Sequence, residues 1–170
     1  MMIANKKHFI WTIVIASIAI AINVFIIVQS CLNGIKSTNS SGIVVNILKS
    51  IINAFSKDAI NEGNIDSFTH VVRKLVGHFG LFVCSGLSSS LAIHFASYYL
   101  KRYQWWYGLI FTLFFGLFLA GLTELIQSFI PDRSGQLTDV LIDYSGYILG
   151  TGIIVLIVFL VSRKKKHQEN

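Results

Sequence analysis

The sequence predicts an all-α integral membrane protein, a four-helix bundle with an extracytoplasmic amphipathic helix between helices 1 and 2. Apolar residues make up 54% of the 170 residues and charged residues only 13%, whereas a soluble domain carries about 25% charged residues. Four apolar segments are long enough to cross a bilayer, which takes about 20 residues. Basic residues flank these segments, which is where the charges that orient membrane helices usually lie.

The four expected spans are Phe9–Val28, Leu75–Leu100, Trp106–Ile126 and Leu137–Val161. The first follows Lys6 and Lys7, as a signal peptide would, but its apolar run exceeds the about 7–15 residues of a cleaved signal. We therefore expect a retained anchor. The chain divides into an anchor with an outer loop (1–66), a core of three helices (67–162) and a basic cytoplasmic tail (163–170).

The basic residues favour an arrangement with both termini in the cytoplasm. The inner loop and tail are then short and densely basic, whereas the outer basic residues are spread over a long loop. The inner residues are Lys6, Lys7, Lys101, Arg102 and Arg163–Lys166, and the outer ones are Lys36, Lys49, Lys57, Arg73, Lys74 and Arg133. The net charge of +6 does not indicate a nucleic-acid partner, because no folded polar face interleaves these residues.

The loop from Gln29 to Asp66 contains a helix of another kind. Apolar residues recur there at three- and four-residue spacing with polar residues opposite, which predicts an amphipathic helix of about four turns. The apolar residues are Val44, Ile47, Leu48, Ile51, Ile52 and Phe55, and the polar ones are Asn46, Lys49, Asn53 and Lys57. This helix either lies on the outer membrane surface or packs against the bundle. Residues 61–64 end it, and we expect Ser67 to cap the next helix.

The second span carries ionisable residues, which cost about 2.5–3.5 kcal/mol each at the centre of a membrane helix. His70, Lys74 and His78 are spaced by four and share one helical face, with Arg73 beside it. Arg73 and Lys74 can also be read as interface residues that reach out to water. His78 lies one turn deeper, so that reading does not explain it. The same face continues through Ser85 and Ser89.

The third and fourth spans carry acidic residues. Glu124 and Gln127 are three residues apart and neighbours on one face, which continues through two small residues, Gly116 and Ala120. Asp139 and Asp143 are four apart on the fourth span, and Gly146 and Gly150 continue their face with GxxxG spacing. Small residues at such positions let another helix approach closely. The position of Asp139 also suits the positive end of a helix dipole.

A tight turn, 131–135, joins the last two spans and brings Arg133 to the same outer end. Three basic residues can offset three acidic residues there, so the cluster is either an ion-pair network that clamps helix ends or the lining of an outward-facing pocket. We favour the pocket, because a clamp needs fewer groups. The predicted ligand-binding residues are Arg73, Lys74, His78, Glu124, Gln127, Arg133, Asp139 and Asp143.

The order and spacing of these residues resemble the VanZ-like family over about residues 70–152. The motif runs Arg73-Lys74-x3-His78-Phe79, then Glu124-x2-Gln127-x3-Pro131-x-Arg133-Ser134-Gly135-Gln136-x2-Asp139-Val140-x2-Asp143-x2-Gly146-x3-Gly150. Many members carry a glutamate where this chain has Gly80-Leu81, and a glycine where it has Asp132. The resemblance implies a multi-pass protein of the bacterial cytoplasmic membrane that lowers susceptibility to teicoplanin-type glycopeptide antibiotics, and it supplies no reaction.

Three functions remain open. The favoured one is binding without turnover, in which an outer pocket holds an anionic lipid, a cell-wall precursor group or a glycopeptide, with Arg73, Lys74 and Arg133 suited to phosphate. The alternative is an intramembrane enzyme acting on a lipid phosphate or glycolipid, with His78 and Glu124 as the candidate catalytic residues. A transporter would need an oligomer, and the sequence leaves the oligomeric state open. No cofactor is expected, and a His/Glu/Asp set of such generic spacing does not by itself predict a metal site.

Overall fold

The computed structural model describes residues 2–32, 34–99, 105–131 and 133–168, and every regular element in these ranges is a helix. The predicted all-α fold class is confirmed. Four helical stretches are long and apolar enough to cross a membrane: His8–Ser30, Ile65–Ser97, Trp106–Ser128 and Leu137–Lys164. Four residues used in the sequence analysis lie outside the described ranges: Leu100, Lys101, Arg102 and Asp132.

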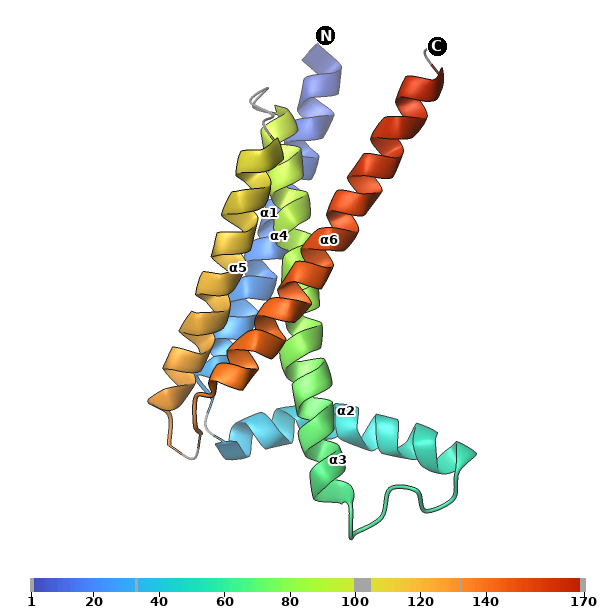
Figure 1. Cartoon of the computed structure of the whole chain (residues 1–170), viewed down its shortest axis with the longest axis vertical. Helices are drawn as coiled ribbons and strands as arrows, with labels where there is room; N and C mark the ends of the chain where they lie inside the picture. Colours follow the sequence, from blue (N-terminus) through green and yellow to red (C-terminus); the bar gives the residue numbers. More distant parts are fainter. Residues whose placement is uncertain (1, 33, 100–104, 132, 169–170) are drawn as a thin grey trace.

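The helices are α1 (Met2–Ser30), α2 (Gly34–Phe55), α3 (Ile65–Val72), η1 (Arg73–Gly80), α4 (Leu81–Tyr99), α5 (Trp105–Ser128) and α6 (Leu137–Gln168). The segment η1 is a π-helix, and α3, η1 and α4 follow one another without a break. The start of α1 and the end of α6 lie at the same end of the bundle, and α2 runs crosswise at the opposite end (Figure 1). The second span therefore begins ten residues before the predicted Leu75.

The central helix of the bundle is α4, which contacts α1, α5 and α6, and α6 crosses it obliquely (Figure 1). At this crossing the backbones touch: a Cβ atom added at Gly150 would collide with the carbonyl oxygen of Val83, and one at Gly146 with that of Phe79. On α5, Gly116 leaves room for the ring of Tyr147. The close helix contacts predicted from the GxxxG spacing and from Gly116 are confirmed.

The buried core is small and lies between these helices. Its buried members are Ile26, Phe82, Leu119, Ala120 and Tyr147. Large apolar side chains instead point outward along α1, α5 and α6, as the exposure of Ile18 (51%), Phe114 (69%) and Leu156 (56%) shows. Contiguous apolar surface of this kind would make a soluble protein aggregate, whereas it suits helices that face lipid.

The amphipathic helix α2 packs against the chain along one side and exposes apolar side chains along another. Val45 is buried, and α2 contacts α3, so one side packs against the chain. The apolar side chains of Ile43, Ile47 and Ile51 are exposed along another side. The helix starts at Gly34, well before the predicted amphipathic stretch. Its first two turns contain few apolar residues, so periodicity did not detect them.

The predicted cap at Ser67 is wrong. Helix α3 begins at Ile65 with Asn64 in the cap position, and no side chain caps it. The Asn64 side chain is used in the preceding turn, where it accepts a hydrogen bond from the Asn61 N–H (2.9 Å) and donates one to the Ala59 carbonyl (2.8 Å). The cap position therefore lies three residues before the serine that was expected to occupy it.

Candidate functional site

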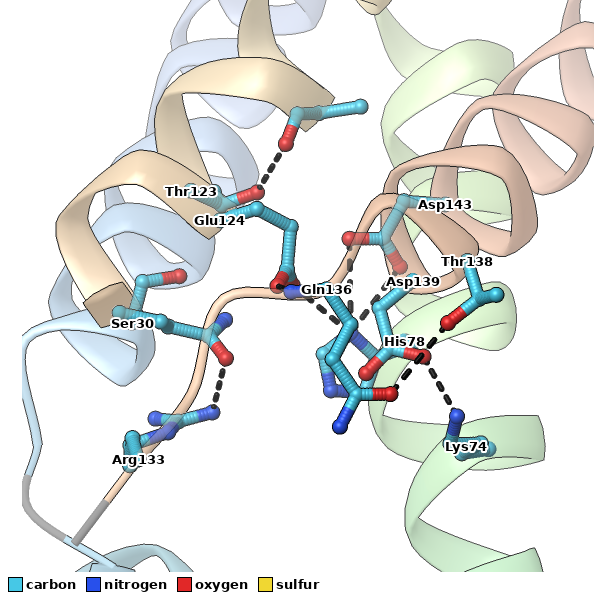
Figure 2. Close-up of polar contacts among 12 residues, drawn as sticks. Ser30, Lys74, His78, Thr123, Glu124, Arg133, Gln136, Thr138, Asp139 and Asp143 are labelled. Carbon is cyan, nitrogen blue, oxygen red and sulfur yellow. Dashed lines mark hydrogen bonds and ion pairs between the residues drawn. The ribbon is translucent and has the colours of Figure 1, made fainter.

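The eight predicted site residues lie near one another at the α2 end of the bundle, where they form three neighbouring groups. His78, Glu124 and Asp143 come from η1, α5 and α6, and their side chains point toward one another (Figure 2). We call these three residues the His78 cluster. Arg133 lies on the far side of Glu124 from His78 (Figure 2), with Gln127 as its partner. Lys74 and Asp139 form the third group, so the charges that were predicted to form one network are divided among a buried cluster, an ion pair and a pocket.

The His78 cluster is held by short contacts between helices. His78 Nδ1 lies 3.1 Å from Asp143 Oδ1 and 3.8 Å from Glu124 Oε1. Both acids are buried, with side-chain exposures of 1% for Asp143 and 5% for Glu124, and His78 is 17% exposed. A carboxylate that contacts an imidazole nitrogen fixes the orientation of the ring. The contacts with the two acids therefore hold the His78 ring in one orientation.

The loop between α5 and α6 folds back onto Glu124. The backbone N–H of Gln136 donates a 2.9 Å hydrogen bond to Glu124 Oε2. A Cβ added at Gly135 would collide with the carbonyl oxygen of Glu124, so a glycine is needed where the loop meets α5. The other carboxylate oxygen, Oε1, is buried and has no hydrogen-bond partner among the described residues.

Lys74 and Asp139 form a separate ion pair at the edge of the cluster. Lys74 Nζ donates to Asp139 Oδ1 at 2.6 Å, and the two side chains are 27% and 11% exposed. Lys74 is not among the residues that line the pocket described next. His70 is exposed. His70 lies in α3, before the change to the π-helix η1, and it belongs to neither the His78 cluster nor the lining of the pocket.

A pocket of about 240 Å³ adjoins the cluster, and we call it the arginine pocket. Both Arg73 and Arg133 line it, together with Gln127, His78 and Asp143. Its apolar wall comes from α1, α2, α3, η1 and α4 and includes Phe25, Ile26, Val44, Val72, Val76, Leu81 and Phe82. The pocket combines positive charge with an apolar wall, and five of the predicted site residues contribute to it.

Arg133 is held in this pocket by neutral acceptors. Its Nη2 donates to Gln127 Oε1 at 2.7 Å, and its Nη1 donates to the carbonyl oxygens of Gln29 and Leu32, each at 3.2 Å. Burial and then the positive charge of Arg73 lower the pKa of the Arg133 guanidinium from its usual value. An arginine stays charged nonetheless, because its ordinary pKa is above 12. Two positive charges therefore influence each other inside one small pocket.

The π-helix η1 carries both Lys74 and His78. Such segments are rare and are found mostly at functional sites, where they alter the register of a helix. Here η1 packs against α6, and it places two residues four apart so that each meets a different aspartate of α6. This local geometry supplies both of the contacts between η1 and the aspartates of α6.

The comparisons with known proteins agree with the sequence motif. The sequence model of one protein family, described as VanZ/LLP1, matches residues 5–159. The chain belongs to the VanZ/LLP1 family. Searches of curated proteins and of solved structures found no match. The match begins in α1. The similarity of this VanZ/LLP1 protein to its family therefore extends beyond residues 70–152, on which the resemblance in the sequence was based.

Sequence reasoning missed one polar residue that ties the first span to the bundle. Asn23 of α1 accepts a 2.6 Å hydrogen bond from the Ser85 hydroxyl and donates a 3.2 Å bond to that of Ser89. It stands among apolar residues, and a polar amide within an apolar span is a detectable signal because it needs a partner on another helix. The serine face predicted on the second span therefore contacts α1 in this VanZ/LLP1 protein.

Proposed function

We propose that this VanZ/LLP1 protein binds the phosphate-bearing head group of a lipid-linked molecule in the arginine pocket, and that this binding lowers susceptibility to teicoplanin-type glycopeptides. The observation that carries the proposal is the position of Arg133, which is fixed in the pocket by neutral partners with Arg73 on the same lining. The antibiotic class follows from the family resemblance.

The donors of Arg133 support an anionic ligand. A guanidinium has five N–H donors, and the described residues accept from Nη1 twice and from Nη2 once. No described residue is shown to accept from the Nε donor or the second Nη2 donor, and we assign these two donors to a ligand. Phosphate oxygens suit such a planar set of donors, because they accept two parallel hydrogen bonds. The charge of Arg133 has no carboxylate within ion-pair distance among the described residues.

The size and walls of the pocket favour a head group attached to a lipid chain. The volume of about 240 Å³ is below the about 300–1,000 Å³ of pockets that hold drug-sized ligands, so a whole glycopeptide would not fit. The apolar wall formed by residues such as Phe25, Val44 and Phe82 suits an acyl or prenyl chain. Two ligands share this chemistry, an anionic phospholipid and a lipid-linked cell-wall precursor.

The proposal includes a location. The protein would reside in the bacterial cytoplasmic membrane with both termini in the cytoplasm, and the arginine pocket and α2 would then face outward. The start of α1 and the end of α6 share one end of the bundle (Figure 1), which is consistent with this arrangement. Labelling of Cys31, which is exposed, by a membrane-impermeant thiol reagent in intact cells would test it.

The first prediction concerns Arg133→Gln. Charge-assisted hydrogen bonds contribute about 1.5–3 kcal/mol, so this variant should bind the lipid about 10- to 100-fold more weakly and should abolish protection against teicoplanin. Binding is measured with purified protein and either phosphatidylglycerol or a prenyl-pyrophosphate-linked precursor, with phosphatidylcholine as the neutral reference. Drug susceptibility is measured in cells that express equal amounts of each variant.

Two variants make the test specific. Lys57→Gln removes the same charge from an exposed residue of the outer loop and should behave as the parent protein does. Arg133→Lys keeps the charge but loses the planar donors, so it should recover only part of the binding. If Arg133→Gln protects cells as well as the parent protein, or if phosphatidylcholine competes equally, the proposal is wrong.

The contact between His78 and Asp143 supports a second candidate function, an intramembrane enzyme acting on a lipid phosphate or glycolipid. A carboxylate-oriented imidazole beside a pocket is an arrangement found in general-base catalysis. The Ser85 hydroxyl donates to Asn23 rather than to His78, so it is not an activated nucleophile here. Purified protein incubated with lipid-linked precursors and several divalent metals should release a product that the His78→Asn variant does not. Failure to detect any product would exclude this candidate.

A further inference from the structure

We propose that His78, Glu124 and Asp143 bind one divalent metal ion. The His78 cluster is not used by the proposed binding of an anion at Arg133, so this inference goes beyond that function and does not depend on it. Three kinds of observation carry it: the separation of the ligand atoms, an unpartnered carboxylate oxygen and the balance of charge.

The three side chains already have the spacing of a metal site. Each offers one ligand atom, and these atoms all lie within 4.8 Å of one another. His78 Nδ1 is 3.1 Å from Asp143 Oδ1 and 3.8 Å from Glu124 Oε1. With metal–ligand bonds of about 2.0–2.2 Å, ligand atoms around one ion lie about 3–4 Å apart. The two separations from Nδ1 fall in that range, and the third, between the two carboxylate oxygens, is no more than 4.8 Å.

Glu124 Oε1 points independently to a missing ligand. It is buried and has no hydrogen-bond partner among the described residues, on a side chain that is only 5% exposed. A buried acceptor left unpaired costs about 1–3 kcal/mol, and more when it is charged. Its companion Oε2 accepts the Gln136 N–H, which fixes the carboxylate so that Oε1 is directed at His78. Hydrogen bonds of this kind commonly orient metal-binding carboxylates.

The charges of the cluster also call for a cation. When both are ionised, Asp143 and Glu124 carry two negative charges, and the nearby Lys74 is already bound to Asp139 at 2.6 Å. Among the described ion pairs, only the imidazole of His78 contacts the two acids. A divalent ion would neutralise both carboxylates and would need His78 in its neutral form, which is the form that binds metals.

The ligand set indicates the class of metal. One imidazole nitrogen and two carboxylate oxygens suit Zn²⁺, Mn²⁺ or Fe²⁺ better than Ca²⁺, which takes 6–8 oxygen ligands. Three protein ligands leave a coordination position open, as they do in catalytic zinc sites. Because His78 and Asp143 both line the arginine pocket, a small ligand in the pocket has access to that open position.

The test is metal binding by the purified full-length protein with no lipid ligand added. Protein stripped with a chelator is titrated with Zn²⁺, Mn²⁺ and Co²⁺, and retained metal is measured after gel filtration. We expect one tightly bound equivalent of at least one of these ions. His78→Gln, Glu124→Gln and Asp143→Asn should each weaken binding by more than the about 10- to 100-fold typical for loss of a supporting residue.

Asp66→Asn is the matched control, because it removes an exposed aspartate of α3 that lies outside the cluster and is not a proposed ligand. It should retain the bound equivalent. Zinc-edge X-ray absorption on the unmodified protein should show an imidazole and oxygen ligands, and it decides the question if the variants are not recovered folded. The proposal fails if the parent protein retains no equivalent of any of the three ions, if all three ligand variants bind as it does, or if sulfur from Cys31 or Cys84 appears among the ligands.

Discussion

The two hydrogen bonds of Asn23 should contribute measurably to the attachment of α1 to the bundle. Asn23 accepts from the Ser85 hydroxyl at 2.6 Å and donates to Ser89 at 3.2 Å. Ser85 is fully buried and Ser89 is 6% exposed, so water cannot replace either bond. Substituting Asn23 by alanine removes both bonds at once, and the serine substitutions remove them separately.

The magnitude follows from the number and geometry of these bonds. Hydrogen bonds between membrane helices contribute about 0.6 kcal/mol on average and at most about 1.7 kcal/mol. The short bond to Ser85 should lie above that average and the longer bond to Ser89 below it. We therefore expect coupling free energies of about 1 kcal/mol for Asn23 with Ser85 and about 0.5 kcal/mol with Ser89. Asn23→Ala alone should lower the free energy of unfolding by about 1.5 kcal/mol.

The assay is a double-mutant cycle, which cancels the other effects of each substitution. The free energy of unfolding is measured by titration with a denaturing detergent in mixed micelles for Asn23→Ala, Ser85→Ala, Ser89→Ala and the two pairs. Ser17→Ala is the control on α1, because Ser17 is exposed, and it should change stability by less than about 0.5 kcal/mol. Coupling energies indistinguishable from zero for both pairs would refute this account of how α1 is attached.

Two further substitutions test the packing of α6. Gly150→Val should lower the free energy of unfolding by about 1–3 kcal/mol, because any Cβ at Gly150 collides with the backbone of α4. Gly152→Val makes the same change where a Cβ meets nothing within 4 Å, and similar losses for both variants would contradict the predicted close crossing. Tyr147→Phe removes a buried hydroxyl that makes no hydrogen bond of good geometry among the described residues, although Ser89 lies close enough to interact with it, so it should leave stability unchanged or raise it by up to about 1 kcal/mol. A loss above about 1 kcal/mol in detergent unfolding would mean that this hydroxyl has a partner.

The membrane fold was predictable because the signals that specify it are local and long. Runs of about 20 apolar residues gave the four spans, and small residues at four-residue spacing gave the contact face of α6. The predicted ends of the spans were less accurate where a polar segment is also helical. The segment 65–74 is too polar to be read as part of a span, and yet it continues α4 as helix, because its backbone hydrogen bonds do not depend on apolar side chains.

The residues of the site were predictable, but their partners were not. Spacing along one helix identified His78, Glu124 and Asp143 as candidates, since each was costly to place in a membrane without a reason. Which acid each basic residue meets depends on the crossing of η1 with α6, and no local pattern encodes that crossing. The sequence therefore grouped Lys74 and Arg133 together, whereas Lys74 pairs with Asp139 and Arg133 with neutral acceptors.

The π-helical segment has a consequence for comparing this chain with its relatives. Because a π-helix closes its hydrogen bonds over one more residue than an α-helix does, the helix from Ile65 to Tyr99 is longer in sequence than its rise implies. A relative with an uninterrupted α-helix here would need fewer residues between the position of Lys74 and that of Ser85 to keep both in place. An alignment that forbids gaps inside membrane spans would then shift one of the two positions, and would report a lost site residue where only the register differs.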